Sequence, residues 1–137
     1  MTKDLYHDVV KVALENEGWK VTDDPLTFRV GEIGFRIDLA AEKILIADKE
    51  DEKIAVEIKT FIQQSHLHAF YEAIGQYDNY FFALEDYEPL RVLYLAVPID
   101  VCQDFFQKPF IQKVVSRKNI KLIIYNPIDT MFLLWKK

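Results

Sequence analysis

The chain has 137 residues, of which 50% are apolar and 28% charged, as expected for one globular domain spanning residues 1–137 rather than a disordered or fibrous protein. Its 17 basic and 22 acidic residues give a formal charge of −5, which excludes a protein that is basic overall. It has a single cysteine, no apolar run near the roughly 20 residues that cross a bilayer, and no signal-peptide pattern, so we expect a cytoplasmic protein without a membrane partner.

The first half of the chain predicts one helix followed by short strands. Apolar residues at three- and four-residue spacing predict a helix over residues 3–17, which Gly18 is placed to end. Alternating or apolar runs then predict short strands at 19–22, 26–30, 35–39 and 44–47, with 26–30 and 35–39 joined as a hairpin. The short connections favour an antiparallel meander.

The second half predicts a mixed arrangement. A strand at 54–61 precedes a helix over 65–84 with Ser65 as its N-cap, and residues 91–97 form an almost wholly apolar strand. Two short helices at 100–107 and 109–118 and final strands at 121–125 and 131–135 complete the pattern. The fold class is therefore α/β, with an α+β-like mixed sheet flanked by helices.

The strand at 54–61 carries the most informative polar pattern. Apolar and polar residues alternate, so Glu57 and Lys59 point to the face opposite Ile54 and Val56. Asp38 ends another apolar segment, nineteen residues before Glu57. If those two segments are neighbours, two carboxylates and an ammonium group form a cluster that can hold a divalent cation beside a phosphate.

Mg²⁺ prefers oxygen ligands in octahedral geometry, and Asp38, Glu57 and the carbonyl of Ile58 supply such oxygens. Lys59 would stabilise the charge of a phosphate under attack, and Gln76, on the following helix, would orient a water or a phosphate. We therefore expect Mg²⁺ or Mn²⁺ as cofactor, which the isolated protein need not carry. The alternative is a solvated Glu-x-Lys pair and a solvent-facing glutamine.

Two further features bear on partners. Residues 108–121 contain five basic side chains and no acidic one, which predicts either a solvated helix face or a surface for DNA or a partner protein. The pairs Phe81-Phe82 and Phe105-Phe106 each place at least one ring on the surface unless something covers it, so a homo-oligomer is plausible.

The chain also resembles a known family. Ile37-Asp38 followed by Val56-Glu57-Ile58-Lys59 resembles the signature of the PD-(D/E)XK nuclease superfamily, although Ile37 stands where that signature has proline. Segments distributed nearly end to end are similar to the cyanobacterial XisH family, the fdxN element excision controlling factors; they include Leu5-Tyr6-His7-Asp8, Gly18-Trp19, Asp24-Pro25, Ala41-Glu42, Gly75-Gln76-Tyr77 and residues 93–98.

The resemblance implies a restriction-endonuclease-like fold and a role in site-specific DNA rearrangement. By that resemblance Asp38 and Glu57 match the metal-binding acids, Lys59 the catalytic lysine and Gln76 the helix glutamine. The implied partners are DNA, an XisI-like protein and a recombinase. Two hypotheses remain open at this point: a metal-dependent endonuclease that hydrolyses phosphodiesters, and a non-catalytic accessory subunit that binds the XisI-like protein or the recombinase.

Overall fold

The structure is a computed structural model and describes residues 2–45, 50–62, 65–129 and 133–137. Helices and strands follow one another as the sequence predicts, with boundaries that shift by a few residues. In chain order the elements are α1 (Thr2–Asn16), β1 (Lys20–Asp23), β2 (Leu26–Val30), β3 (Ile33–Ile37), β4 (Leu39–Leu45), β5 (Glu50–Ile58), α2 (His66–Tyr87), β6 (Val92–Pro98), α3 (Ile99–Gln103), the 3₁₀ turn η1 (Phe105–Gln107), α4 (Pro109–Arg117), β7 (Leu122–Tyr125) and β8 (Leu133–Lys136).

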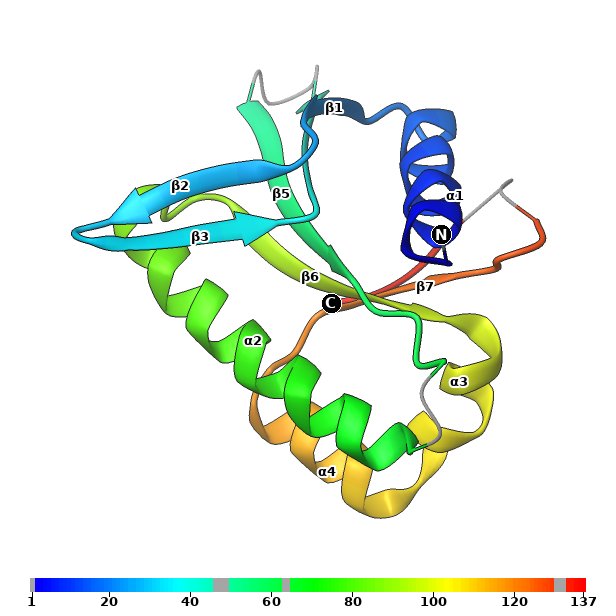
Figure 1. Cartoon of the computed structure of the whole chain (residues 1–137). Coiled ribbons are helices and arrows are strands. Elements are labelled where there is room, and N and C mark those ends of the chain that lie inside the picture. Colours follow the sequence, from blue (N-terminus) through cyan, green and yellow to red (C-terminus); the bar gives the residue numbers. More distant parts are fainter. Residues whose placement is uncertain (1, 46–49, 63–64, 130–132) are drawn as a thin grey trace.

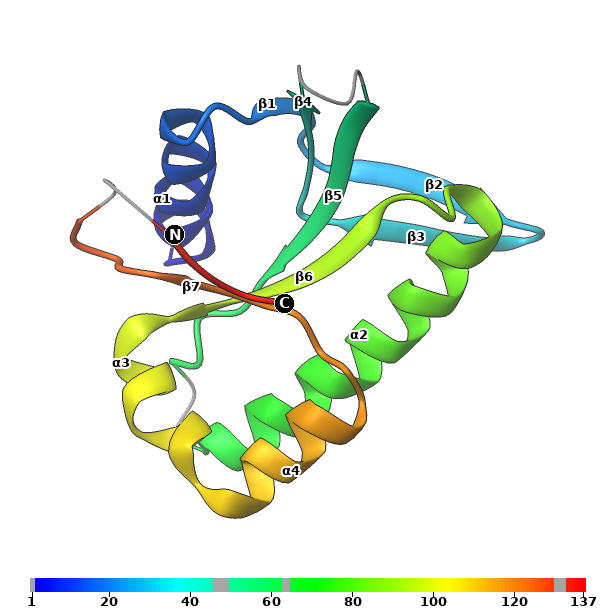
Figure 2. The ribbon, with the colours of Figure 1, turned by 180° about the vertical axis from the view of Figure 1, so that it is seen from behind.

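A mixed sheet lies between two layers of helices (Figure 1). Within the described residues it has six strands in the order β1-β4-β5-β6-β7-β8. The pairs β5–β6 and β6–β7 are parallel and the other neighbours antiparallel. Figures 1 and 2 show α1 on one face, with α2, α3 and α4 on the other. The predicted mixed sheet with flanking helices is confirmed.

The meander predicted for the first strands is wrong in one respect. β2 and β3 pair with each other as a separate two-stranded sheet, and β1 pairs with β4 across the inserted hairpin. The run predicted as one strand over 35–39 is divided, since β3 ends at Ile37, the chain bends at Asp38 and β4 begins at Leu39. The predicted strand at 44–47 is the end of β4, except that residues 46 and 47 lie outside the described residues, as do 131 and 132 of the predicted last strand.

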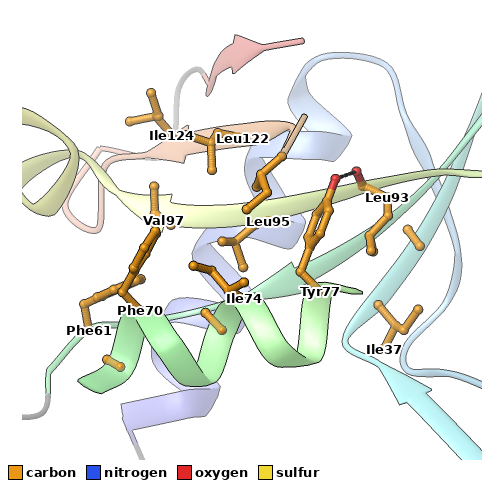
Figure 3. Packing of buried hydrophobic residues seen from close by; sticks show 14 of the residues in the cluster. Ile37, Phe61, Phe70, Ile74, Tyr77, Leu93, Leu95, Val97, Leu122 and Ile124 are labelled. Atoms are coloured by element: carbon orange, nitrogen blue, oxygen red, sulfur yellow. Dashed lines mark hydrogen bonds between the residues drawn. The ribbon is translucent and has the colours of Figure 1, made fainter. Parts of the chain in front are cut away.

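The core has two parts, one on each face of the sheet. Val10 and Leu14 of α1 pack against Val56 and Ile123 on one face. On the other, Phe70, Ile74 and Tyr77 of α2 pack on β6 and β7, as Figure 3 shows.

Tyr77 also ties α2 to the sheet. Its hydroxyl donates a hydrogen bond to the Leu93 carbonyl at 3.0 Å and accepts one from the Lys121 N–H at 3.2 Å. The alternation in the strand containing Glu57 had predicted one buried face. Both faces of this strand are covered, because α2 lies over the polar side as well and Glu57 is buried there. Ser65 caps α2 as predicted, its hydroxyl accepting from the His68 N–H at 3.1 Å.

Candidate functional site: a buried acid pair beneath helix α2

Strand pairing brings the two predicted acids together. β4 and β5 are antiparallel neighbours in which Leu39 pairs with Val56. Asp38 directly precedes Leu39 and Glu57 directly follows Val56, so the two carboxylates lie at the same end of this strand pair. Both residues are buried, with 4% and 7% of their surface exposed. The two segments that carry Asp38 and Glu57 are thus neighbours, which the sequence analysis had to assume.

Backbone hydrogen bonds fix the orientation of both carboxylates. The Ile58 N–H donates to Asp38 Oδ2 at 2.8 Å, and the Asp38 N–H donates to Glu57 Oε1 at 3.3 Å. The other oxygen of each carboxylate lies near a cation: Asp38 Oδ1 is 4.0 Å from Arg36 Nη1, and Glu57 Oε2 is 3.4 Å from Lys59 Nζ. Each acid therefore has one oxygen held by the backbone and one that lies near a cationic side chain.

Burial makes the negative charge of Glu57 costly. Loss of solvation, followed by repulsion from the Asp38 carboxylate, raises the Glu57 pKa from an ordinary 4.5 to about 7, although Lys59 acts in the opposite direction. Near neutral pH the two carboxylates can thus share one proton. A bound cation in place of that proton would stabilise both negative charges. This is the electrostatic condition expected of a cation site built from two carboxylates.

The backbone of Lys59 is fixed by two other strands. Its N–H donates to the Ala96 carbonyl of β6 at 2.9 Å, and its own carbonyl accepts from the Tyr125 hydroxyl of β7 at 3.0 Å. The side chain is then directed by its ion pair with Glu57, and the ammonium group stays at the rim of the acid pair.

A cavity of about 580 Å³ opens above the acids and is closed on its far side by α2. Asp38, Glu57, Lys59 and Gln76 all line it, together with Ile58. The side-chain oxygen of Gln76 is buried and has no hydrogen-bond partner among the residues that the structure describes. A buried amide oxygen without a partner is costly, so a water or ligand in the cavity would be stabilised by it.

Arg36 and Tyr80, which sequence reasoning did not assign to the site, also line this cavity. Burial, and then the charges of Glu57 and Asp38, raise the pKa of the Tyr80 phenol to about 12, so it stays a neutral donor. The spacing in the sequence could have suggested both residues. Arg36 is two positions before Asp38 on an extended segment, and Tyr80 is one helical turn after Gln76.

The donor set fits a hard divalent cation of the Mg²⁺ class, which needs only one or two carboxylates. Asp38 and Glu57 both line the cavity, so carboxylate oxygens of both residues border the space that an ion would occupy. Among the described residues, no group of three or more His, Cys, Asp or Glu side chains is placed to hold a metal. The N–H of Ile58 donates a hydrogen bond to Asp38. That the Ile58 carbonyl binds a metal ion stays a prediction.

Comparison with known proteins decides the family. A sequence model described as XisH protein matches residues 1–132. The chain belongs to the XisH family. Two crystal structures are similar to it, each 40% identical: an XisH family protein from Nostoc punctiforme PCC 73102, with a TM-score of 0.88 over 97% of this chain and 99% of that one, and an fdxN element excision controlling factor protein from Anabaena variabilis, with a TM-score of 0.89 over 98% and 99%. No curated protein matches significantly.

A second cavity in this XisH-family chain, of about 860 Å³, lies on the other side of α2. Phe81 and Phe82 line it, with 46% and 62% of their surface exposed, together with Lys118 and Lys121. One pair of aromatic rings is thus exposed as predicted. The rings of Phe105 and Phe106 are both covered, since they are buried against Phe70 of α2. No helix in the described ranges is long and apolar enough to span a membrane.

Proposed function

We propose that this XisH-family protein acts on DNA during excision of a DNA element, as a metal-dependent, endonuclease-like protein of the PD-(D/E)XK type. The fdxN element excision controlling factor protein from Anabaena variabilis, which is 40% identical, supports the process by its name. The observation that carries the chemistry is the buried pair of Asp38 and Glu57 beside Lys59. A cytoplasmic location goes with this proposal.

The proposed reaction is hydrolysis of a phosphodiester. A water oxygen forms a bond to phosphorus, the bond from phosphorus to the leaving oxygen breaks, and the leaving oxygen takes up a proton. A bound Mg²⁺ or Mn²⁺ would supply Lewis-acid activation of the phosphate and of water. Asp38, Glu57 and the Ile58 carbonyl would hold that ion.

The remaining side chains would act on the substrate directly. Lys59 would stabilise the negative charge that develops on the phosphate oxygens, since its ammonium group lies at the rim of the acid pair. The unpartnered Gln76 oxygen would accept a hydrogen bond from the attacking water and orient it. Tyr80, kept neutral, would donate to a phosphate oxygen.

Cleavage of a DNA substrate carrying the excision junctions tests the proposal. Wild-type protein should cut or nick it with Mn²⁺ or Mg²⁺ and stop when EDTA is added. Asp38→Asn and Lys59→Ala should each lose at least about 100-fold in rate, because each removes a charge that acts in the transition state. The exposed residues Asp8 and Lys20 supply matched controls, Asp8→Asn and Lys20→Ala. Unchanged rates in the two site variants would refute the nuclease assignment.

A second candidate function is a non-catalytic accessory subunit that binds an XisI-like protein or the recombinase. The exposed rings of Phe81 and Phe82 beside a large cavity favour it, as does the acidic net charge of −5. This candidate predicts that complex formation survives Asp38→Asn and is lost in Phe82→Ala. Self-association through the same rings also stays a prediction.

A further inference from the structure

The β2–β3 hairpin stands outside the main sheet and reaches past the end of α2 (Figures 1 and 2). One of its faces is anchored on α2. The Phe28 ring stacks on Tyr87 with centroids 4.5 Å apart, and Phe35 meets Tyr80 edge-on at 6.4 Å. Because aromatic contacts fix this face, the orientation of the opposite face is fixed as well.

The opposite face carries two arginines and little else. Arg36 pairs with Thr27 and Arg29 with Gly34 across the antiparallel strands, so these four residues share one face and all are exposed. The arginines are diagonal neighbours, about 7–8 Å apart at the backbone. The Arg29 guanidinium donates to the Glu32 carbonyl at 2.8 Å, a contact that limits its freedom but leaves its charge uncompensated.

This arginine face (Thr27, Arg29, Gly34 and Arg36) is continuous with the acid cavity. Arg36 lines both the cavity above Asp38 and a shallow hollow of about 410 Å³ on the hairpin. Its side chain is 55% exposed and reaches to 4.0 Å from Asp38. Lys59, Arg36 and Arg29 therefore form a path of three cations that leads from the acid pair out along the hairpin.

Charge complementarity indicates what this path binds. At its inner end Lys59 and Arg36 face the two acids, whereas the residues that line the hollow on the hairpin include Arg29 and Arg36 and no acidic side chain. Gly34 leaves the middle of the face open, since a Cβ built there would meet no atom within 4 Å. Two arginines separated by a residue without a side chain leave room for a nucleic-acid strand, and each guanidinium can donate two hydrogen bonds to a phosphate.

We propose that the arginine face binds the phosphate backbone of duplex DNA and leads one strand to the acid pair. The inference rests on the proposed function, which it deepens by naming a surface that positions the substrate. Arg29 and Arg36 would contact phosphates on one side of the scissile position. Such contacts fix register without reading bases, so any sequence preference has to arise elsewhere.

The test is DNA binding without cleavage. A fluorescent duplex of about 30 base pairs is titrated in EDTA at several KCl concentrations, with wild type, Arg29→Gln, Arg36→Gln and the double variant. We expect each single change to weaken binding several-fold and to reduce the slope of log affinity against log salt by about 1. Lys20→Gln, which removes an equal charge from the exposed edge strand β1, should bind like wild type.

Gly34 offers a second test that leaves both arginines in place. Gly34→Glu and Gly34→Gln add side chains of the same size to the open middle of the face, where there is room for a Cβ. If phosphates lie there, Gly34→Glu should weaken binding at least several-fold more than Gly34→Gln. Melting curves of both variants confirm that each is folded.

The possible outcomes separate this inference from the nuclease proposal. Wild-type affinity and salt slope in the double arginine variant overturn the inference, even if Asp38→Asn abolishes cleavage. Weakened binding in the arginine variants supports it, even if no cleavage is ever seen. Absence of DNA binding by the wild type, or loss only of binding to an acidic protein in the arginine variants, also overturns it.

Discussion

Glu57 lowers the stability of the folded protein by an amount that depends on pH. Its pKa is raised by burial and by Asp38 to about 7 in the fold, against an ordinary 4.5. Between these two values the folded state keeps a proton that the unfolded state has released, so wild-type stability falls as pH rises. Above about pH 7 the full penalty is present.

Glu57→Gln should therefore stabilise the protein at high pH. We expect a gain on the order of 1–3 kcal/mol at pH 8 in EDTA, narrowing towards zero as pH falls to about 4.5. Urea unfolding across this pH range measures it. Glu15→Gln, an exposed change on α1, corrects for the general effect of losing one carboxylate. A variant that is equally stable or less stable at pH 8 contradicts this prediction.

That the two acids and Lys59 lie together could be predicted at the residue scale, while the burial of the acids could not. The alternation in the strand predicted that Glu57 and Lys59 point to the same face, because side chains two residues apart in a strand lie on one side of the sheet. The burial of both acids depends on α2 folding back over the sheet, which no local pattern encodes. Arg36 was missed although it lies two positions before Asp38, because which face of the hairpin meets the cavity depends on where the hairpin sits in space.

At the scale of elements, the hairpin depends on a small aromatic contact. Phe28 is buried and stacks on both Tyr87 and Phe35, with centroids 4.5 and 5.4 Å apart. Since β2 and β3 pair only with each other within the described residues, Phe28 holds the hairpin on the rest of the domain together with the buried Leu26 and Ile37. The loss of one ring should therefore act mainly on the hairpin.

Phe28→Ala should release the hairpin before the rest of the domain unfolds. Removing a buried phenylalanine costs about 3–5 kcal/mol, so amide exchange over residues 26–37 should accelerate by about 100-fold or more. Amides of β6 should change much less. Phe110→Ala, whose ring is 57% exposed, is the control. Uniform acceleration across the whole sheet would show that the hairpin is not a separate unit.

The boundaries of the hairpin show where sequence patterns are insufficient. Residues 35–39 alternate as one strand would, yet the chain bends at Asp38 and the next residues join a different sheet. Backbone propensity gives little warning of the bend. Two contacts impose the bend. Leu39 pairs with Val56 of β5, and the Ile58 N–H donates a hydrogen bond to the Asp38 carboxylate. The bend is thus a product of the same bond that orients the acid.

For the whole molecule, fold class followed from the order of helical and extended patterns, but the strand order did not. A helix between two apolar strands predicts a parallel pair, as found for β5 and β6. The pairing of β1 with β4 and the place of β8 at the far edge depend on contacts between distant segments. Packing, not local periodicity, selects among such orders.

One such distant contact joins the first helix to the last strand. Glu17 follows α1, and its carboxylate accepts from the Leu133 N–H at 2.8 Å and from the Trp135 Nε1–H at 2.9 Å. Trp135 also stacks on Trp19, with centroids 5.7 Å apart. Both oxygens of one carboxylate thus bind β8, which otherwise pairs only with β7 among the described strands.

Glu17→Gln should loosen β8 without disturbing the acid pair. The amide keeps one acceptor oxygen and turns an N–H₂ towards a donor, so at least one charge-assisted bond is lost, at a cost of about 1–3 kcal/mol. Amide exchange in β8 should accelerate by roughly 10- to 100-fold, while exchange at Ile58 stays unchanged. Glu15→Gln, an exposed change on α1, is the matched control. If β8 stays fully protected in Glu17→Gln, side-chain packing alone holds the end of the chain, and the stacked tryptophans become the next contact to remove.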